Sequence, residues 1–310
     1  MKLVFCGTPD FAVPSLERLA ATGYDIQLVV TQPDRPQGRG MELAAPPVKQ
    51  SALKLSLPVI QPEKIKKNEE FQAALTAIHP DAIIVVGYGR IVPPWMLNLP
   101  RFGNINVHAS LLPKYRGAAP VQWAIANGET TTGVTTMRLD EGLDTGNILL
   151  QREMEIKPDD TSLTLWPRLA AMGAGLLVET LHGLEQRAIV PDAQDHAQAT
   201  LAPILKKEDG LIDFNRTARQ IYDRLRGFQP WPGAYTIFRG KNLKIVAAQV
   251  AEASSKLASG ELHASESKLV VGCGGSTALE LIQLQPEGRK PLQVRDFING
   301  YRLTAGERLG

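Results

Sequence analysis

A chain of 310 residues is longer than one hydrophobic core usually organises, so we expect two domains. The composition, 44% hydrophobic and 21% charged, contains no biased tract, which excludes a low-complexity chain. The net charge of +2 is unevenly spread: residues from Leu201 onward hold 16 Lys and Arg against 11 Asp and Glu, whereas the first 200 hold 18 against 21. This asymmetry hints at a polyanionic partner for the second half, although ordinary surface scatter explains it equally well.

The start of the chain and its cysteines bear on the compartment. Only five residues precede Cys6 in the first apolar stretch, which is too short for a signal peptide or a membrane span. Cys6 and Cys273 are far apart and lack the spacing of a zinc site, so we expect no metal. We therefore expect a cytoplasmic protein with reduced cysteines and no membrane partner.

Strand-like and helix-like patterns alternate along the first half. Apolar runs predict strands at residues 2–7, 25–31, 58–62, 81–89, 104–110, 132–139 and 146–156. Helical spacing of apolar residues predicts helices at residues 8–23, 47–56, 68–80 and 161–186. The alternation indicates an α/β fold, a Rossmann-like doubly wound parallel sheet.

The pattern changes in the second half. Periodicity fades at residues 190–207, which we interpret as a linker between a first domain, 1–189, and a smaller one, 208–310. After one helix at 217–228, short apolar runs separated by Gly and polar turns predict strands at 234–240, 243–250, 260–264, 268–273 and 278–286. Such strands favour a small antiparallel sheet or barrel.

The strand "NINVHAS" carries two polar residues, Asn106 and His108, that project to the same side. The turn "GTPDFA" after the first strand lacks phosphate-binding patterns, so we expect the ligand at the carboxyl edge of the sheet. Asp144, in the Gly-rich loop "LDEGLDTGN", is the candidate to approach His108.

These three residue types form a coherent chemical set. An amide and an imidazolium can donate hydrogen bonds to an oxyanion, and a nearby carboxylate stabilises the imidazolium. No evident nucleophile is present, which favours direct transfer between two bound substrates. Any one of the three alone would be read as an ordinary buried polar or turn residue; only the set indicates a catalytic site.

The run Asn106-x-His108-x-Ser110-Leu111-Leu112-Pro113, followed by "YRGAAP" and later "GLDTG", resembles the folate-dependent formyltransferase family over the first domain. The resemblance implies transfer of a formyl group from the cosubstrate 10-formyltetrahydrofolate to an amine. Asn106 and His108 would polarise the formyl oxygen, and Asp144 would position His108 and assist proton transfer. The implied folate site is lined by Ser110, Leu111, Leu112 and Pro113, with Arg90 and Ile91 against the pterin.

Members of this family differ in the amine that they formylate. A member acting on glycinamide ribonucleotide would need only the first domain, whereas those acting on methionyl-initiator-tRNA or an amino-sugar nucleotide carry a second one. The loop "TQPDRPQGRGMELAAPPVK", with Arg35 and Arg39, resembles the loop that tRNA-specific members place against the tRNA acceptor end. Here Met41-Glu42 stands where relatives often have lysine, which lowers the positive charge of the loop.

The second domain would accordingly be an OB-like tRNA-binding barrel, with Lys206 and Lys207 along the tRNA path. We interpret Trp231, in "FQPWPGAYT", as a packing residue rather than a base-stacking platform. We expect a monomeric enzyme that gives N-formylmethionyl-tRNA for translation initiation. Two alternatives are a folate-dependent formyltransferase for a small amine, such as an amino-sugar nucleotide, and a non-enzymatic RNA-binding protein.

Overall fold

The computed structural model describes residues 1–37, 42–252, 256–265 and 267–310. The chain divides into two compact units. The first unit comprises Met1–Pro120, Thr131–Glu155 and Trp166–Ala202, and the second comprises Val121–Thr130, Ile156–Leu165 and Pro203–Gly310. The domain boundaries predicted from the sequence, 1–189 and 208–310 with a linker at 190–207, stay a prediction.

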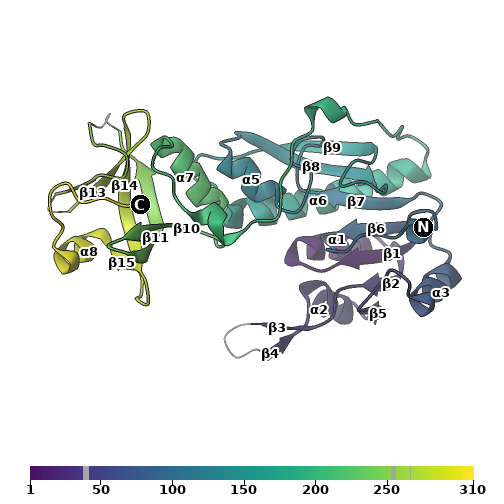
Figure 1. The fold of residues 1–310 in the computed structure, drawn as a ribbon. Helices are drawn as coiled ribbons and strands as arrows, with labels where there is room; N and C mark the ends of the chain where they lie inside the picture. The colour runs from purple at the N-terminus through teal and green to yellow at the C-terminus, as the bar shows by residue number, and fades with distance from the viewer. Residues whose placement is uncertain (38–41, 253–255, 266) are drawn as a thin grey trace. The chain divides into compact units, whose positions relative to one another are not determined.

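Strands and helices alternate along the first unit, as predicted (Figure 1). Its strands are β1 (Lys2–Gly7), β2 (Asp25–Val30), β3 (Arg35–Gln37), β4 (Glu42–Ala44), β5 (Val59–Ile60), β6 (Ala82–Val86), β7 (Asn104–His108), β8 (Thr131–Arg138) and β9 (Ile148–Glu155). Its helices are α1 (Val13–Ala21), α2 (Pro47–Lys54), α3 (Glu69–Ile78), α4 (Pro94–Leu97) and most of α6 (Ser162–Glu185), with short 3₁₀ turns η1 (Asp10–Ala12) and η2 (His196–Gln198). None of the helices in the described part of the chain has the length and apolarity that crossing a bilayer requires.

Within the described residues, seven strands of the first unit form one sheet in the order β5-β2-β1-β6-β7-β8-β9. The pairs from β5 to β7 are parallel, whereas β8 and β9 run antiparallel to their neighbours. The predicted Rossmann-like class is confirmed, and two antiparallel strands extend the parallel sheet at one edge. Strands β3 and β4 form a separate hairpin within the predicted arginine loop.

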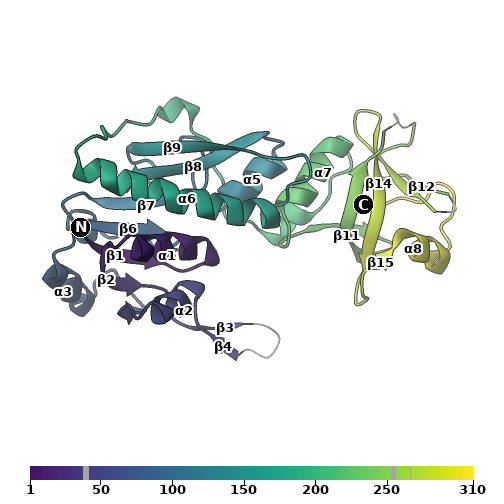
Figure 2. The ribbon, with the colours of Figure 1, turned by 180° about the vertical axis from the view of Figure 1, so that it is seen from behind.

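The two faces of this sheet are covered by different helices. On one face, apolar residues of β1, β2 and β6 form a buried cluster with Phe71 and Leu75 of α3 and Met96 of α4. On the other face, α6 crosses β7 and β8, as Figure 2 shows from behind, and Gly173 of α6 lies directly against Val107. Because side chains alternate along a strand, Asn106 and His108 project away from α6.

The second unit is built around an antiparallel sheet in the order β10-β11-β14-β13-β12, with β15 paired to β14. Its strands are β10 (Ala234–Phe238), β11 (Lys241–Val250), β12 (Leu262–Ala264), β13 (Leu269–Cys273), β14 (Thr277–Pro286) and β15 (Leu292–Gln293). Its helices are α5 (Pro120–Ala126), α7 (Ala218–Gly227) and α8 (Val294–Tyr301), with one 3₁₀ turn, η3 (Lys207–Gly210).

The last residues of the chain bridge the two edges of this sheet. Gly310 N–H donates to the carbonyl of Ile237 in β10, at 3.0 Å, and Leu309 N–H donates to Gly260 beside β12, at 2.9 Å. Leu262 N–H of β12 donates to the carbonyl of Glu307 at 2.8 Å. The gap between the edge strands is thereby filled, which agrees with the predicted small barrel.

Candidate active site

Asn106 and His108 lie at the carboxyl end of β7, which is buried between β6 and β8. They are 8% and 6% exposed, respectively, so each keeps a small opening to the surface. The side-chain amide of Asn106 has no hydrogen-bond partner among the described residues, which leaves it available to a ligand.

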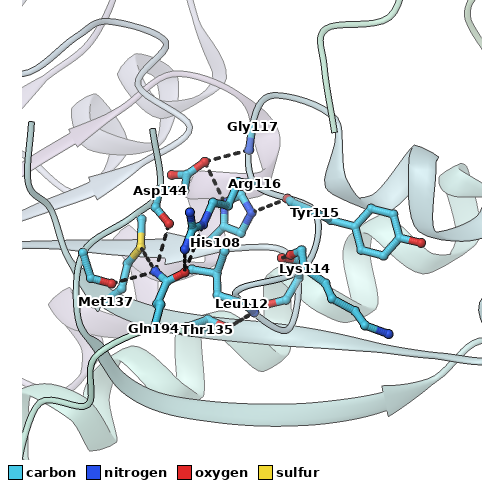
Figure 3. Close-up of polar contacts among 12 residues, drawn as sticks. His108, Leu112, Lys114, Tyr115, Arg116, Gly117, Thr135, Met137, Asp144 and Gln194 are labelled. Carbon is cyan, nitrogen blue, oxygen red and sulfur yellow. Dashed lines mark hydrogen bonds and ion pairs between the residues drawn. The ribbon is translucent and has the colours of Figure 1, made fainter. Parts of the chain in front are cut away.

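The two ring nitrogens of His108 have different partners (Figure 3). Nε2 lies 2.9 Å from the carbonyl oxygen of Tyr115, and because a carbonyl can only accept, Nε2 carries a proton. Nδ1 lies 3.7 Å from Oδ2 of Asp144. The structure therefore brings together two of the three predicted catalytic residues across 36 positions of sequence, and Nδ1 is the nitrogen left for chemistry.

Asp144 is held by contacts that no local sequence pattern predicts. Its Oδ2 accepts a 2.8 Å hydrogen bond from Gly117 N–H, and its carbonyl accepts one of 2.9 Å from Nε2 of Gln194. Its φ of 52° lies in the left-handed region, which aspartate tolerates better than most residues. The loop carrying the carboxylate is thus fixed by two other loops.

Gln194 also accepts hydrogen bonds from the buried guanidinium of Arg116. Its Oε1 accepts hydrogen bonds from Nε and Nη2 of Arg116, at 3.1 and 2.6 Å, while its Nε2 also donates to the carbonyl of Gly146 at 2.7 Å. Arg116 is buried, and Nη2 is also 3.1 Å from Nδ1 of His196. In the described part of the chain, Arg116 has no carboxylate partner, so Gln194 is its principal acceptor. The sequence predicted no role for Arg116, which lies within "YRGAAP", or for Gln194.

The backbone of the predicted folate loop, residues 110–113, is hydrogen-bonded to the side chain of Thr135 in β8. Thr135 Oγ1 donates to the carbonyl of Ser110 at 2.7 Å and accepts from Leu112 N–H at 3.1 Å. Ser110 and Leu112 are buried, whereas Leu111 and Pro113 are partly exposed. Ser110 and Leu112 therefore support the loop, Leu111 and Pro113 offer surface, and their role in binding folate stays a prediction.

The loop after β6 borders the same edge of the sheet. The carbonyl of Tyr88 accepts hydrogen bonds from Thr8 after β1, at 3.2 Å, and from Gln32 after β2, at 2.9 Å. Beyond it, Nε of Arg90 is buried without a hydrogen-bond partner among the described residues, and Ile91 is 90% exposed. This meeting of loops lies at the carboxyl edge, where α/β sheets bind ligands.

Cys6 of β1 carries a free thiol, the side chain in this strand that could act as a nucleophile. Burial raises the pKa of its thiol far above the usual range, so it stays protonated and unreactive. No group of three or more His, Cys, Asp and Glu that could hold a metal ion occurs in the part of the chain that the structure describes.

The arginine loop is anchored at its base. The carboxylate of Asp34 pairs with Lys49 at 2.8 Å and accepts from Gln61 at 2.7 Å, and these hydrogen bonds, the one from Lys49 first, lower its pKa. Arg35 begins β3 and is exposed, with Nη2 3.5 Å from Oε1 of Gln32. Arg39, the other arginine predicted to contact tRNA, lies outside the described residues.

The predicted basic residues of the second unit, Lys206 and Lys207, are both exposed at η3. Trp231 is 54% exposed, so its interpretation as a packing residue is wrong.

Comparison with known proteins assigns both parts of the chain. Residues 1–181 match the formyl transferase family, and residues 204–302 match the formyl transferase C-terminal domain. The chain therefore belongs to the formyl transferase family. The methionyl-tRNA formyltransferase of Koribacter versatilis is 64% identical over 310 residues, covering 100% of this chain and 99% of the relative. That of Acidobacterium capsulatum is 61% identical over 310 residues, covering all of both chains.

The chain belongs to the methionyl-tRNA formyltransferase family. Among solved structures, an N-formyltransferase from Helicobacter canadensis, in complex with folinic acid and dTDP-3-aminofucose, is similar with a TM-score of 0.68. It is 19% identical, covering 92% of this chain and 99% of that one, and at that identity the likeness shows the fold alone.

Proposed function

We propose that this protein transfers the formyl group of 10-formyltetrahydrofolate to the amino group of methionyl-initiator-tRNA, and that Asn106, His108 and Asp144 carry out the transfer. The observation that carries the proposal is the approach of His108 Nδ1 to Asp144 Oδ2, at 3.7 Å, beside the unpartnered amide of Asn106. The full-length relatives support the tRNA acceptor. The product, N-formylmethionyl-tRNA, serves translation initiation.

The proposed chemistry is an acyl transfer without a covalent enzyme intermediate. When the amine attacks the formyl carbon, negative charge develops on the formyl oxygen and positive charge on the attacking nitrogen. The Asn106 amide donates a hydrogen bond to that oxygen, and His108 donates a second one through a protonated Nδ1. Asp144 stabilises this imidazolium and takes part in removing the proton from the attacking amine. The bond between the formyl carbon and the folate nitrogen then breaks, and that nitrogen takes up the proton that the amine has lost.

The Tyr115 carbonyl gives His108 its orientation. Since Nε2 is bound to that carbonyl at 2.9 Å, protonation of the neutral ring occurs at Nδ1, on the side of Asp144. A proton taken up there is therefore adjacent to a carboxylate. This arrangement supports the assignment of the acid–base role to Nδ1 rather than Nε2.

The loops at the carboxyl edge fit a folate, the class of formyl donor that formyl transferases use. Nε of Arg90 is a buried donor without a partner in the described part of the chain, and Ile91 presents an exposed apolar surface beside it. We propose that these two residues contact the pterin and that Leu111 and Pro113 complete the lining. Ser110 and Leu112 hold the loop in place through Thr135.

The acceptor would be bound through cationic side chains in both units. Arg35 is exposed on a hairpin whose base is fixed by Asp34 and Lys49, and an arginine suits contacts with phosphates and base edges. Lys206 and Lys207 are exposed cations of the second unit. Affinity for tRNA should accordingly fall with salt, because phosphate contacts release counterions.

The decisive experiment measures formylation of charged initiator tRNA with 10-formyltetrahydrofolate. His108→Ala and Asp144→Asn should each lower kcat by about a hundredfold to a thousandfold, the usual cost of removing one oxyanion-stabilising group. His182→Ala, on the exposed side of α6, is the matched control and should keep the wild-type rate. Near-normal turnover in either active-site variant would contradict the proposed roles, and formylation of an amino-sugar nucleotide instead of tRNA would contradict the acceptor.

A further inference from the structure

An open cavity of about 390 Å³ lies on the second unit, away from its hydrophobic core. Its wall includes the side chains of Trp231 and Tyr235 together with those of Lys207 and Lys244. Two aromatic rings and two cations around one hollow differ from ordinary surface, where large aromatic side chains are seldom exposed.

The strand register explains how these side chains come together. Strands β10, β11 and β14 are neighbours in the sheet of the second unit (Figure 1). In the register of these strands, Tyr235 of β10 lies opposite Lys244 of β11, and Lys244 lies opposite Gln285 of β14. The residues on either side of them in each strand, such as Leu243 and Ile245, point into the barrel core. Tyr235, Lys244 and Gln285 therefore form a row across the outer face of three neighbouring strands.

Trp231 completes this surface from the loop before β10. It is 54% exposed and makes no ring–ring or cation–π contact among the described residues. A tryptophan that served only to stabilise the unit would have most of its surface covered, as its neighbour Phe228 has. The exposed ring is thus available to stack on a flat ligand.

The charge around the cavity favours an anionic ligand. Lys207 and Lys244 have no acidic partner in the described part of the chain, and Arg289 and Lys290 follow the cavity-lining Gly288. Glu287 is the one acidic residue among the described lining residues, and its Oε2 already accepts a hydrogen bond of 3.1 Å from Asn242 N–H. Cations beside free aromatic faces are the combination that binds single-stranded nucleic acid, with bases on the rings and phosphates on the cations.

We propose that this cavity binds an unpaired nucleotide of an RNA, whose base stacks on Trp231 and Tyr235 while its phosphates contact Lys207 and Lys244. An unpaired nucleotide is required because paired bases do not offer a free face to an aromatic side chain. The proposal rests on the proposed function insofar as the RNA is the tRNA acceptor. It adds a contact made by a base, separate from the reaction at the amino group.

The test uses the full-length protein and a fluorescently labelled single-stranded RNA hexamer, followed by anisotropy without folate. The wild type should bind the hexamer more tightly than a duplex of the same sequence. Trp231→Ala should weaken hexamer binding by about tenfold to a hundredfold, and Trp231→Phe, which keeps an aromatic face, should restore most of it. The Michaelis constant for charged tRNA should rise in parallel in Trp231→Ala.

Matched lysine variants distinguish a phosphate contact at the cavity from a general loss of positive charge on the second unit. Lys244→Gln should weaken hexamer binding and reduce its salt dependence, whereas Lys268→Gln, an exposed lysine paired with Glu280, should change neither. Equal hexamer affinity for Trp231→Ala and the wild type would overturn the proposal, as would AMP binding as tightly as the hexamer or no hexamer binding at all. Because this assay does not depend on formylation, an inactive protein that still binds through Trp231 would contradict the proposed function and not this site.

Discussion

Gln194→Ala removes one side chain that touches no proposed substrate yet joins Arg116 to the loop of Asp144. Gln194 is 6% exposed, so water cannot easily replace its contacts. The substitution deletes two hydrogen bonds from a guanidinium and two to the carbonyls of Asp144 and Gly146. Hydrogen bonds to charged groups contribute about 1.5–3 kcal/mol each and neutral ones about 1 kcal/mol.

These contributions are not additive, because the four bonds share one side chain. We expect a loss of about 3–5 kcal/mol in the free energy of unfolding, since Arg116 is left buried with His196 as its remaining side-chain partner. In addition kcat should fall about a hundredfold, because displacing a catalytic group by about 1 Å has that effect. Denaturant unfolding and steady-state formylation measure the two losses separately.

Gln194→Glu separates the two roles. A glutamate keeps an acceptor for Arg116, but it loses the Nε2–H donors and places a carboxylate against the carbonyls of Asp144 and Gly146. The free energy of unfolding of Gln194→Glu should be nearer to that of the wild type than the free energy of unfolding of Gln194→Ala is. Its kcat should be as low as that of Gln194→Ala. Gln198→Ala, an exposed glutamine of the same segment, should change neither. A Gln194→Ala enzyme with wild-type kcat would refute the positioning role.

Three further changes test the arginine loop, the barrel closure and the packing of α6. Arg35→Ala should lower kcat/KM for charged initiator tRNA by about tenfold, and an unchanged value would remove Arg35 from the acceptor site. Glu307→Gln should lower the stability of the second unit by about 1 kcal/mol at pH 7, because the hydrogen bond from Arg239 lowers the pKa of the Glu307 carboxyl. That stabilisation is present above the unfolded-state pKa of about 4.3 and is lost as pH falls through the lower folded-state value, so acid unfolding curves of the two proteins should converge. Gly173→Ala should lower the free energy of unfolding by about 1–3 kcal/mol, because the added Cβ would lie 2.8 Å from Val107. Gly175→Ala is the control, because a Cβ there would meet open space and should not destabilise the protein. Equal thermal unfolding of the two variants would contradict the described packing of α6.

Periodic patterns predicted the frame of the first unit well. The apolar runs at 2–7 and 81–89 became β1 and β6, and the run 104–110 contained β7, because a buried strand needs apolar residues on both faces. The same runs could not give strand direction, so the antiparallel course of β8 and β9 was not foreseen. The short helix α4 and the helix α8 also lacked a signal long enough to be recognised against their loops.

The candidate site was predictable where its residues lie on a strand and less so where they lie on loops. Asn106 and His108 followed from the period of two in β7. Gln194 did not, because its contacts with Asp144 and Arg116 join segments 50 and 78 positions apart and leave no local pattern. Trp231 was misjudged because composition cannot tell a tryptophan that is packed from one that is exposed on a loop.

The geometry around His108 depends on loops more than on the sheet. The strand places the imidazole, but Tyr115, whose φ is 60°, supplies the carbonyl that fixes Nε2, and Asp144, whose φ is 52°, faces Nδ1. Left-handed conformations are costly for such residues, so both persist because neighbouring contacts hold them. Tyr115 N–H donates to Thr200 at 2.8 Å and Asp144 accepts from Gly117 and Gln194. Substitutions at Gln194 and Thr200 should therefore affect turnover without any change in the strand that bears the catalytic imidazole.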